Sequence, residues 1–313
     1  MKRSGPLLRV GVSVALFAVV GWWLDLRAVA ARVAAMDLGW VAAALGLSVA
    51  QVALLAWRWC YTATQLGVGL PFGTAWREYY LSIFLNQVLP GGVLGDASRA
   101  WRQARVLTPP SDNGGPAARA VIFERLSAQA VMTTVAVVSL LTLPAQVAAS
   151  GSVLAGAIAF AALIATGAVA WVRRQASSES LAGQVIRELV TAHFTPSVFL
   201  VQFLTAVAAV ASYLLTFLCA VRAVGVETDV AVLLPLVAPV LMTMLLPVTV
   251  AGWGLREGAA AMLWSAVGLT AADGVVVSVA YGVLVLLSSL PGGLVLLRSP
   301  VGTARRTSME GRS

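Results

Sequence analysis

Charge is what this sequence lacks most. Only 11% of its 313 residues are charged, whereas roughly a quarter are charged in an ordinary soluble domain. Hydrophobic residues make up 59%, and the mean hydropathy is +0.89. Lysine and histidine occur once each, as Lys2 and His193. A chain of this composition needs lipid as its solvent, which excludes a soluble domain large enough to hold an independent function.

The scarce residue types also exclude several kinds of catalytic site. A Walker A loop needs a lysine after its glycines, and Lys2 cannot serve. Zinc sites need clusters of His and Cys, but Cys60 and Cys219 both lie in or beside apolar runs and are read as packing residues. No G-x-S-x-G elbow or Rossmann glycine pattern occurs. We therefore expect no cofactor, no metal and no catalytic residue set.

Long apolar runs, in contrast, are abundant. About 20 helical residues cross the hydrocarbon core of a bilayer. Two stretches, 79–95 and 231–268, are interrupted by Pro and Gly and carry charges, so they are predicted to be re-entrant hairpins that line protein or a wet cavity. The predicted spanning helices are 7–24, 38–57, 124–143, 152–171, 197–220 and 275–297.

The basic residues fit this layout, since Lys and Arg accumulate in cytoplasmic loops. With the N-terminus inside, Arg27, Arg32 and Arg222 fall outside and Arg256 lies in the second hairpin. The other 17 of the 21 basic residues then lie on the cytoplasmic side. The net charge of +8 is therefore interpreted as a topology signal. Both termini are predicted to be cytoplasmic, and the hairpins to enter from opposite sides.

One motif occurs in both hairpins. Residues 89–99 and 246–256 both fit L-P-x-x-V-x-G-x-x-x-R, and their offset is 157 residues. Three predicted spans separate the copies, which inverts the second relative to the first. In a chain so rich in Leu, Val and Gly the match could also arise by chance, and 290–293 repeat L-P-G-G alone. The expected fold is an all-α integral membrane protein of about six spans and two oppositely oriented re-entrant helical hairpins, forming an inverted repeat.

A single polytopic membrane domain is predicted over 1–298, with inverted halves at about 1–143 and 152–298. No linker is long enough to separate domains. Residues 175–196 form a polar connector that holds His193, for which no function is predicted. Residues 299–313 form a basic cytoplasmic tail that is predicted to be disordered.

The interrupted helices mark the expected binding site, as in many transporters. Pro ends the first half-helix, Gly lets the backbone turn tightly and approach a ligand, and the next half-helix presents its positive N-terminal end. Such an end suits an anionic oxygen such as phosphate, which makes Arg99 and Arg256 the leading substrate contacts. The other hairpin candidates are Pro90, Gly91, Gly92, Gly95, Pro247, Gly252 and Gly254.

Ionisable residues inside a bilayer are costly unless they are paired or hydrated, so each is a functional candidate. Those in the apolar stretches are Glu78, Asp96, Arg99, Glu124, Arg125, Arg256 and Glu257. Glu78, Ser82 and Asn86 recur on one helix face, and Arg125, Gln129 and Thr133 form a second stripe. The two stripes and the hairpin tips could enclose a polar groove that is open to lipid. For Glu124–Arg125 and Arg256–Glu257, the alternative is a capping or topology pair.

Three segments carry a family resemblance: 86–99 (NQVLPGGVLGDASR), 123–126 (FERL) and 246–258 (LPVTVAGWGLREG). Over nearly its whole length the chain resembles the flippase-like family of the lysylphosphatidylglycerol synthetase membrane region. The resemblance implies a bacterial inner-membrane protein that moves lipids between leaflets. The sequence ends at Ser313 without a soluble aminoacyl-transfer domain, so synthesis of lysyl lipid is not expected. The family's motif residues map to Asn86, Pro90, Gly95, Asp96, Arg99, Glu124, Arg125, Pro247, Gly252, Gly254, Arg256 and Glu257.

The leading hypothesis is a lipid flippase or transporter for an anionic phospholipid or a polyprenyl-phosphate-linked lipid. Its expected ligands are membrane lipids with anionic headgroups, and nucleic acid is not expected. Two alternatives stay open. One is an integral membrane enzyme acting on a lipid phosphate, with Asp96 or Glu124 as general base. The other is an accessory subunit of a membrane glycosyltransferase. The lipid, the energy source, a partner enzyme and the oligomeric state are left undetermined.

Overall fold

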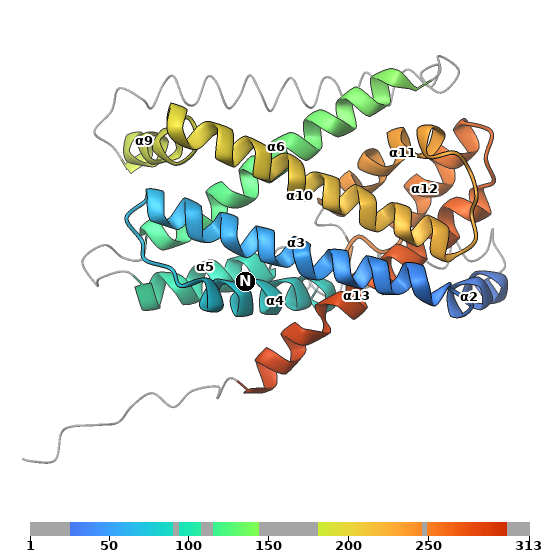
Figure 1. The fold of residues 1–313 in the computed structure, drawn as a ribbon, viewed down its shortest axis with the longest axis horizontal. Helices are drawn as coiled ribbons and strands as arrows, with labels where there is room; N and C mark the ends of the chain where they lie inside the picture. The colour runs from blue at the N-terminus through green and yellow to red at the C-terminus, as the bar shows by residue number, and fades with distance from the viewer. Residues whose placement is uncertain (1–25, 90–93, 108–114, 144–180, 246–248, 299–313) are drawn as a thin grey trace, which may run out of the picture.

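The computed structural model of the chain describes residues 26–89, 94–107, 115–143, 181–245 and 249–298. The regular elements of these ranges are helices, arranged as in Figure 1. In chain order they are α2 (Leu26–Ala34), α3 (Leu38–Gln65), α4 (Phe72–Val88), α5 (Leu94–Leu107), α6 (Gly115–Thr142), α9 (Leu181–His193), α10 (Pro196–Ala223), α11 (Val230–Met242), the 3-10 helix η2 (Thr243–Leu245), α12 (Leu255–Ala266) and α13 (Ala271–Arg298).

Four of the helices, α3, α6, α10 and α13, are long and apolar enough to cross a membrane. They contain the predicted spans 38–57, 197–220 and 275–297 and all but the last residue of 124–143, which confirms a multi-pass, all-α membrane protein. Two of them begin or end well beyond the predicted runs, because charged residues there are paired inside the protein: Arg58 lies near Glu124, and Arg119 pairs with Glu188. The predicted spans 7–24 and 152–171 lie outside the described residues.

The first predicted hairpin is a pair of antiparallel helices, α4 and α5. Side chains of α4 pair in reverse order with those of α5: the carboxylate of Glu78 accepts from Arg102, and the hydroxyl of Ser82 donates to Asp96. The two helices extend beyond the predicted 79–95 at both ends, and on α5 this adds Arg102, which pairs with Glu78 of α4. Its entry into a membrane stays a prediction.

The second predicted hairpin consists of α11, η2 and α12. Helix α11 has 13 residues, about 20 Å, which is shorter than the hydrocarbon core of about 30 Å. The chain turns back through three residues with positive φ, Ala251, Gly252 and Gly254. Glycine adopts this backbone without strain, which gives two of the motif glycines a physical role. Re-entry of this hairpin into a membrane also stays a prediction.

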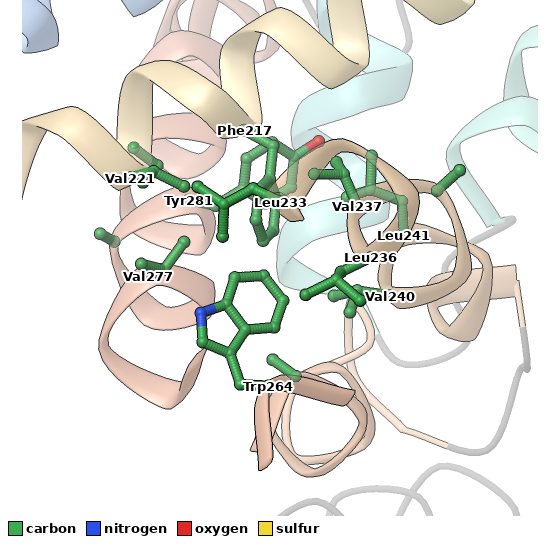
Figure 2. Packing of buried hydrophobic residues seen from close by; sticks show 14 of the residues in the cluster. Phe217, Val221, Leu233, Leu236, Val237, Val240, Leu241, Trp264, Val277 and Tyr281 are labelled. Atoms are coloured by element: carbon green, nitrogen blue, oxygen red, sulfur yellow. The ribbon is translucent and has the colours of Figure 1, made fainter. Parts of the chain in front are cut away.

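A hydrophobic core holds the second hairpin against α10 and α13. Figure 2 shows Phe217 of α10, Leu236 of α11, Trp264 of α12 and Tyr281 of α13 around one centre. The ring of Phe217 lies 6.2 Å from that of Trp264 and 5.3 Å from that of Tyr281, centroid to centroid. All four side chains are buried, so this apolar packing fixes α12 and the residues at its start.

The order of helices and their packing partners repeat between 26–142 and 181–298. Related helices begin between 155 and 161 residues apart, as α3 and α10 do at residues 38 and 196. Contacts repeat as well: α4 packs on α13 as α11 packs on α6, and α5 packs on α6 as α12 packs on α13. The related pair α3 and α10 is antiparallel, because Gln51 bonds to Ser212 and Gln202 to Thr62. The assignment of these ranges as inverted halves across a bilayer stays a prediction.

Candidate functional site

The start of α5 is held against α4 by backbone and side-chain hydrogen bonds. The backbone N–H of Gly95 donates to Asn86 Oδ1 at 2.8 Å. A Cβ at Gly95 would overlap the carbonyl oxygen of Ser82, so only glycine permits this approach. Asn86 and Ser82 both donate to Asp96, at 3.1 Å each. The predicted stripe of Glu78, Ser82 and Asn86 therefore shares one face, and that face is turned to α5.

Five charged side chains form a continuous chain of alternating sign. Arg58 Nε lies 4.0 Å from Glu124 Oε1, and Glu124 Oε2 lies 3.6 Å from Arg99 Nη2. Arg99 in turn lies 3.1 Å from Asp96, whose other oxygen is 3.4 Å from Arg125 Nη1. This series of side chains has an arginine at each end, so the five-residue cluster contains three cations and two anions. It carries one excess positive charge.

Aromatic rings enclose the centre of this five-residue cluster. The guanidinium of Arg99 lies over the rings of Trp59 and Tyr79, 4.4 and 4.1 Å from their centroids. The hydroxyl of Tyr79 donates to Glu124. Arg58 and Arg99 are both fully buried, and each has Nε and Nη1 without a hydrogen-bond partner among the described residues. The positive charge of the cluster is therefore incompletely neutralised.

Arg256, in the second copy of the motif, lies in a comparable but neutral cluster. It donates to Glu257 Oε1 and Ser278 Oγ, both at 2.8 Å. Ser278 also donates to Glu257, whose second oxygen accepts the N–H of Gly254 at 2.6 Å. The rings of Trp253 and Tyr281 lie 5.1 and 5.3 Å from the guanidinium carbon. One arginine and one carboxylate balance each other here and join the start of α12 to α13.

A cavity of about 180 Å³ lies beside the five-residue cluster, between α3, α4, α6, α10, α13 and the end of α11. Since a water molecule takes about 30 Å³ in the liquid, the cavity has room for roughly six waters or one small polar group. Its lining is mixed: charged, amide and hydroxyl side chains alternate with methionine, aliphatic and tyrosine side chains. The polar lining includes Ser48, Gln51, Asn86, Gln87, Arg125 and Gln129.

The structure places the predicted site residues in several different environments. Asn86, Glu124 and Arg125 line the cavity. Arg99 and Arg256, the leading predicted contacts, are 0% and 1% exposed and do not line it. The rest lie in the α4–α5 contact (Glu78, Gly95, Asp96), in the Arg256 cluster and its turn (Gly252, Gly254, Glu257), or outside the described residues (Pro90, Gly91, Gly92, Pro247).

The predicted stripe on α6 lies partly on the cavity. Arg125 and Gln129 line it, and Gln129 Nε2 donates to the sulfur of Met242 at 3.2 Å. Thr133 contacts the same sulfur from one turn further along. Since a thioether is a weak acceptor, the Gln129 amide is available for a stronger partner. Its position makes it a candidate ligand contact.

Sequence reasoning missed Arg58 as part of the site. It was assigned to the cytoplasmic arginines because it follows the predicted span 38–57, yet its side chain is fully buried beside Glu124. A charge inside a spanning helix signals an intramembrane partner, and Arg58 qualifies only because α3 continues to Gln65, beyond the apolar run. Within the described ranges, no group of three His, Cys, Asp or Glu side chains could hold a metal ion.

Comparison with known proteins gives one family match. The family described as the lysylphosphatidylglycerol synthase TM region matches residues 9–292, which include every described helix except the last residues of α13. Comparisons with curated proteins and with solved structures give no match.

Proposed function

The chain belongs to the family of the lysylphosphatidylglycerol synthase TM region, and we propose that it moves an anionic phospholipid or a polyprenyl-phosphate-linked lipid between the leaflets of the bacterial inner membrane. The family connects the chain with lipid handling. The proposed lipid class, the transport and the location go beyond that connection. The observation that carries the proposal is the cavity with Arg125 on its wall.

The cavity lies where the two repeating sets of helices meet. Its lining contains pairs of residues related by the same 157-residue offset as the motif. These pairs are Glu124 and Tyr281, Ala128 and Val285, and Gln87 and Met244. A site at the junction of two repeats is the usual position in transporters that work by rocking one repeat against the other. This position supports alternating exposure of the site to the two leaflets.

The size and the lining of the cavity support a lipid headgroup as its occupant. A volume of about 180 Å³ accommodates a small polar group but not acyl chains. Those chains would stay in the surrounding lipid while the headgroup crosses. The amides and Arg125 replace water around the headgroup, which lowers the cost of bringing it into the hydrocarbon region.

Leaflet exchange in proteoliposomes tests the proposal. Labelled phosphatidylglycerol or polyprenyl phosphate is reconstituted with the full chain, and the label in the outer leaflet is quenched over time. Ala128→Phe fills the cavity from α6 and is expected to slow exchange at least tenfold, about 1.4 kcal/mol in the barrier. Ala130→Phe is the matched control, because Ala130 lies on the exposed face of the same helix.

Each outcome has a defined meaning. Slow exchange with Ala128→Phe and native exchange with Ala130→Phe would support transport through the cavity. Equal rates in the two variants would place any exchange elsewhere on the protein. If the native chain exchanged neither lipid class, transport of these lipids would be disproved. Conversion of the lipid in detergent would then favour the membrane enzyme.

A further inference from the structure

The two halves present different charges to the cavity. Arg99 and Arg256 are related by the 157-residue offset, but the residues around them are not equivalent. The positions related to Asp96 and Glu124 hold Trp253 and Tyr281. Likewise, Gly282 stands where the first half has Arg125, and Leu215 stands where it has Arg58. Among the described residues, an excess cation lies beside the cavity in the first half and not in the second.

From this asymmetry we infer that the first half alone binds the anionic group, at Arg125, where a phosphate oxygen of the lipid headgroup replaces Asp96 as the partner of the guanidinium. This inference rests on the proposed function and names the binding site within it. Arg256 then acts as a positioning residue that joins α12 to α13, because its charge is already balanced by Glu257.

The contacts of Asp96 show why it can be replaced. Asp96 accepts hydrogen bonds from Ser82, Asn86 and Arg99, all at 3.1 Å. It therefore stays satisfied when Arg125 leaves. Arg125 lies 3.4 Å from Asp96, longer than the 2.7–2.9 Å of a charge-assisted hydrogen bond. No other ion pair holds Arg125 among the described residues.

The exposure of Arg125 also supports it as the residue that binds the anion. Its side chain is 40% exposed and lines the cavity, whereas Arg58 and Arg99 are fully buried behind it. Those two arginines keep unpartnered N–H groups that add to the positive potential at the cavity wall. One bound anion would bring the five-residue cluster from one excess positive charge to neutrality.

The surrounding groups favour a phosphate ester as the anion. A guanidinium can donate two parallel hydrogen bonds to a phosphate. The side-chain amides of Gln87 and Gln129 also line the cavity and can donate to further oxygens. Gln129 would give up only its bond to the Met242 sulfur. The apolar part of the lining suits the glycerol or prenyl carbons next to the ester.

Binding of dihexanoylphosphatidic acid to the full chain in an uncharged detergent tests the inference by calorimetry. Arg125→Gln is expected to weaken binding at least tenfold, since a charge-assisted hydrogen bond is lost. Arg125→Lys is expected to retain part of the affinity, because the charge remains without the second donor. Asp96→Asn is expected to tighten binding several-fold, because it removes the competing carboxylate.

Arg32→Gln is the matched control. Arg32 is 36% exposed and paired with Asp273, so the substitution removes a similar charge away from the cavity. Its affinity should equal that of the native chain. The melting temperature of each variant verifies folding. If one variant does not fold, the remaining substitutions at Arg125 and Asp96 provide the test.

Three results would overturn the inference. The first is unchanged affinity in folded Arg125→Gln. The second is weakening by Asp96→Asn as large as that by Arg125→Gln, which would make Asp96 a structural support and not a competitor. The third is inorganic phosphate binding as tightly as the lipid, which would remove the lipid headgroup as the ligand. If the lipid binds as expected but is not exchanged between leaflets, the proposed transport is disproved, whereas the binding site at Arg125 is supported.

Discussion

His193 is the last residue of α9, and both nitrogens of its ring are buried. Its ring is buried and packs edge-on against Phe123, 6.3 Å between centroids. Helix α9 is not one of the four candidate spans. Burial, and next the nearby guanidinium of Arg58, lower the pKa of His193 from 6.5 to about 4. The imidazole is therefore neutral at physiological pH.

This shift predicts a loss of stability in acid. Because the folded-state pKa is lower than the unfolded one, the unfolded chain binds the proton first as the pH falls below about 6.5, and the loss is complete near pH 4. The difference in pKa corresponds to at most about 3 kcal/mol. The measurement is unfolding in detergent from pH 7 to pH 4. His193→Phe should show a smaller decrease than the native chain, and equal decreases would contradict the assignment.

At the scale of helices, glycine sets the distance between α4 and two of its neighbours. Gly95 of α5 lies against the backbone of Ser82, and Gly292 of α13 lies against the backbone of Tyr80. A Cβ at either position would overlap a carbonyl oxygen of α4. Helix α4 is therefore packed on both sides through a glycine, which holds it close to α5 and to α13.

Gly95→Ala should force α5 away from α4 and disturb the contacts of Asp96. We expect a loss of about 2 kcal/mol or more in the free energy of unfolding, as in overpacked cores. Gly46→Ala in α3 is the matched control, because no atom lies within 4 Å of the new Cβ. It should be neutral or stabilising by up to about 1 kcal/mol. Thermal unfolding in detergent compares the two, and equal stabilities would contradict the close contact.

The positions of the helices were more predictable from the sequence than the neighbours that each helix packs against. Apolar length predicted α3, α6, α10 and α13, because spanning a bilayer requires it. The spacing of Glu78, Ser82 and Asn86 correctly predicted a shared face, but periodicity does not say what a face meets. The length of α5 was missed because its charged residues end the apolar stretch, and the sequence does not show that Arg102 pairs with Glu78 of α4.

The residues that face the cavity were harder to predict than the helices that carry them. Motif and charge selected Arg99 and Arg256, but which arginine faces a cavity depends on side-chain packing between distant helices. Arg125 and Asn86 were named and do line the cavity. Gln51 and Gln87 also line it, yet a single glutamine has no pattern that distinguishes a lining residue from a buried or exposed one.

At the scale of the molecule, the described helices form two interlocked sets. The crossing contacts, α4 with α13 and α11 with α6, tie each hairpin to the last long helix of the other set. Two peripheral ion pairs repeat this arrangement: Arg32 of α2 pairs with Asp273 at the start of α13, and Glu188 of α9 pairs with Arg119 at the start of α6. Neither set is therefore an independent unit, and movement of one requires the other to shift.

The long helices also connect the protein to the thickness of its bilayer. Each of the four has 28 residues, about 42 Å, against a hydrocarbon core of about 30 Å. In Figure 1, α6 and α13 run obliquely to α3 and α10. A thicker membrane favours more upright helices and a thinner one more tilted helices. Hydrophobic mismatch should therefore make the rate of leaflet exchange depend on acyl chain length. Exchange measured in bilayers of short, medium and long monounsaturated lipids should be fastest at one thickness.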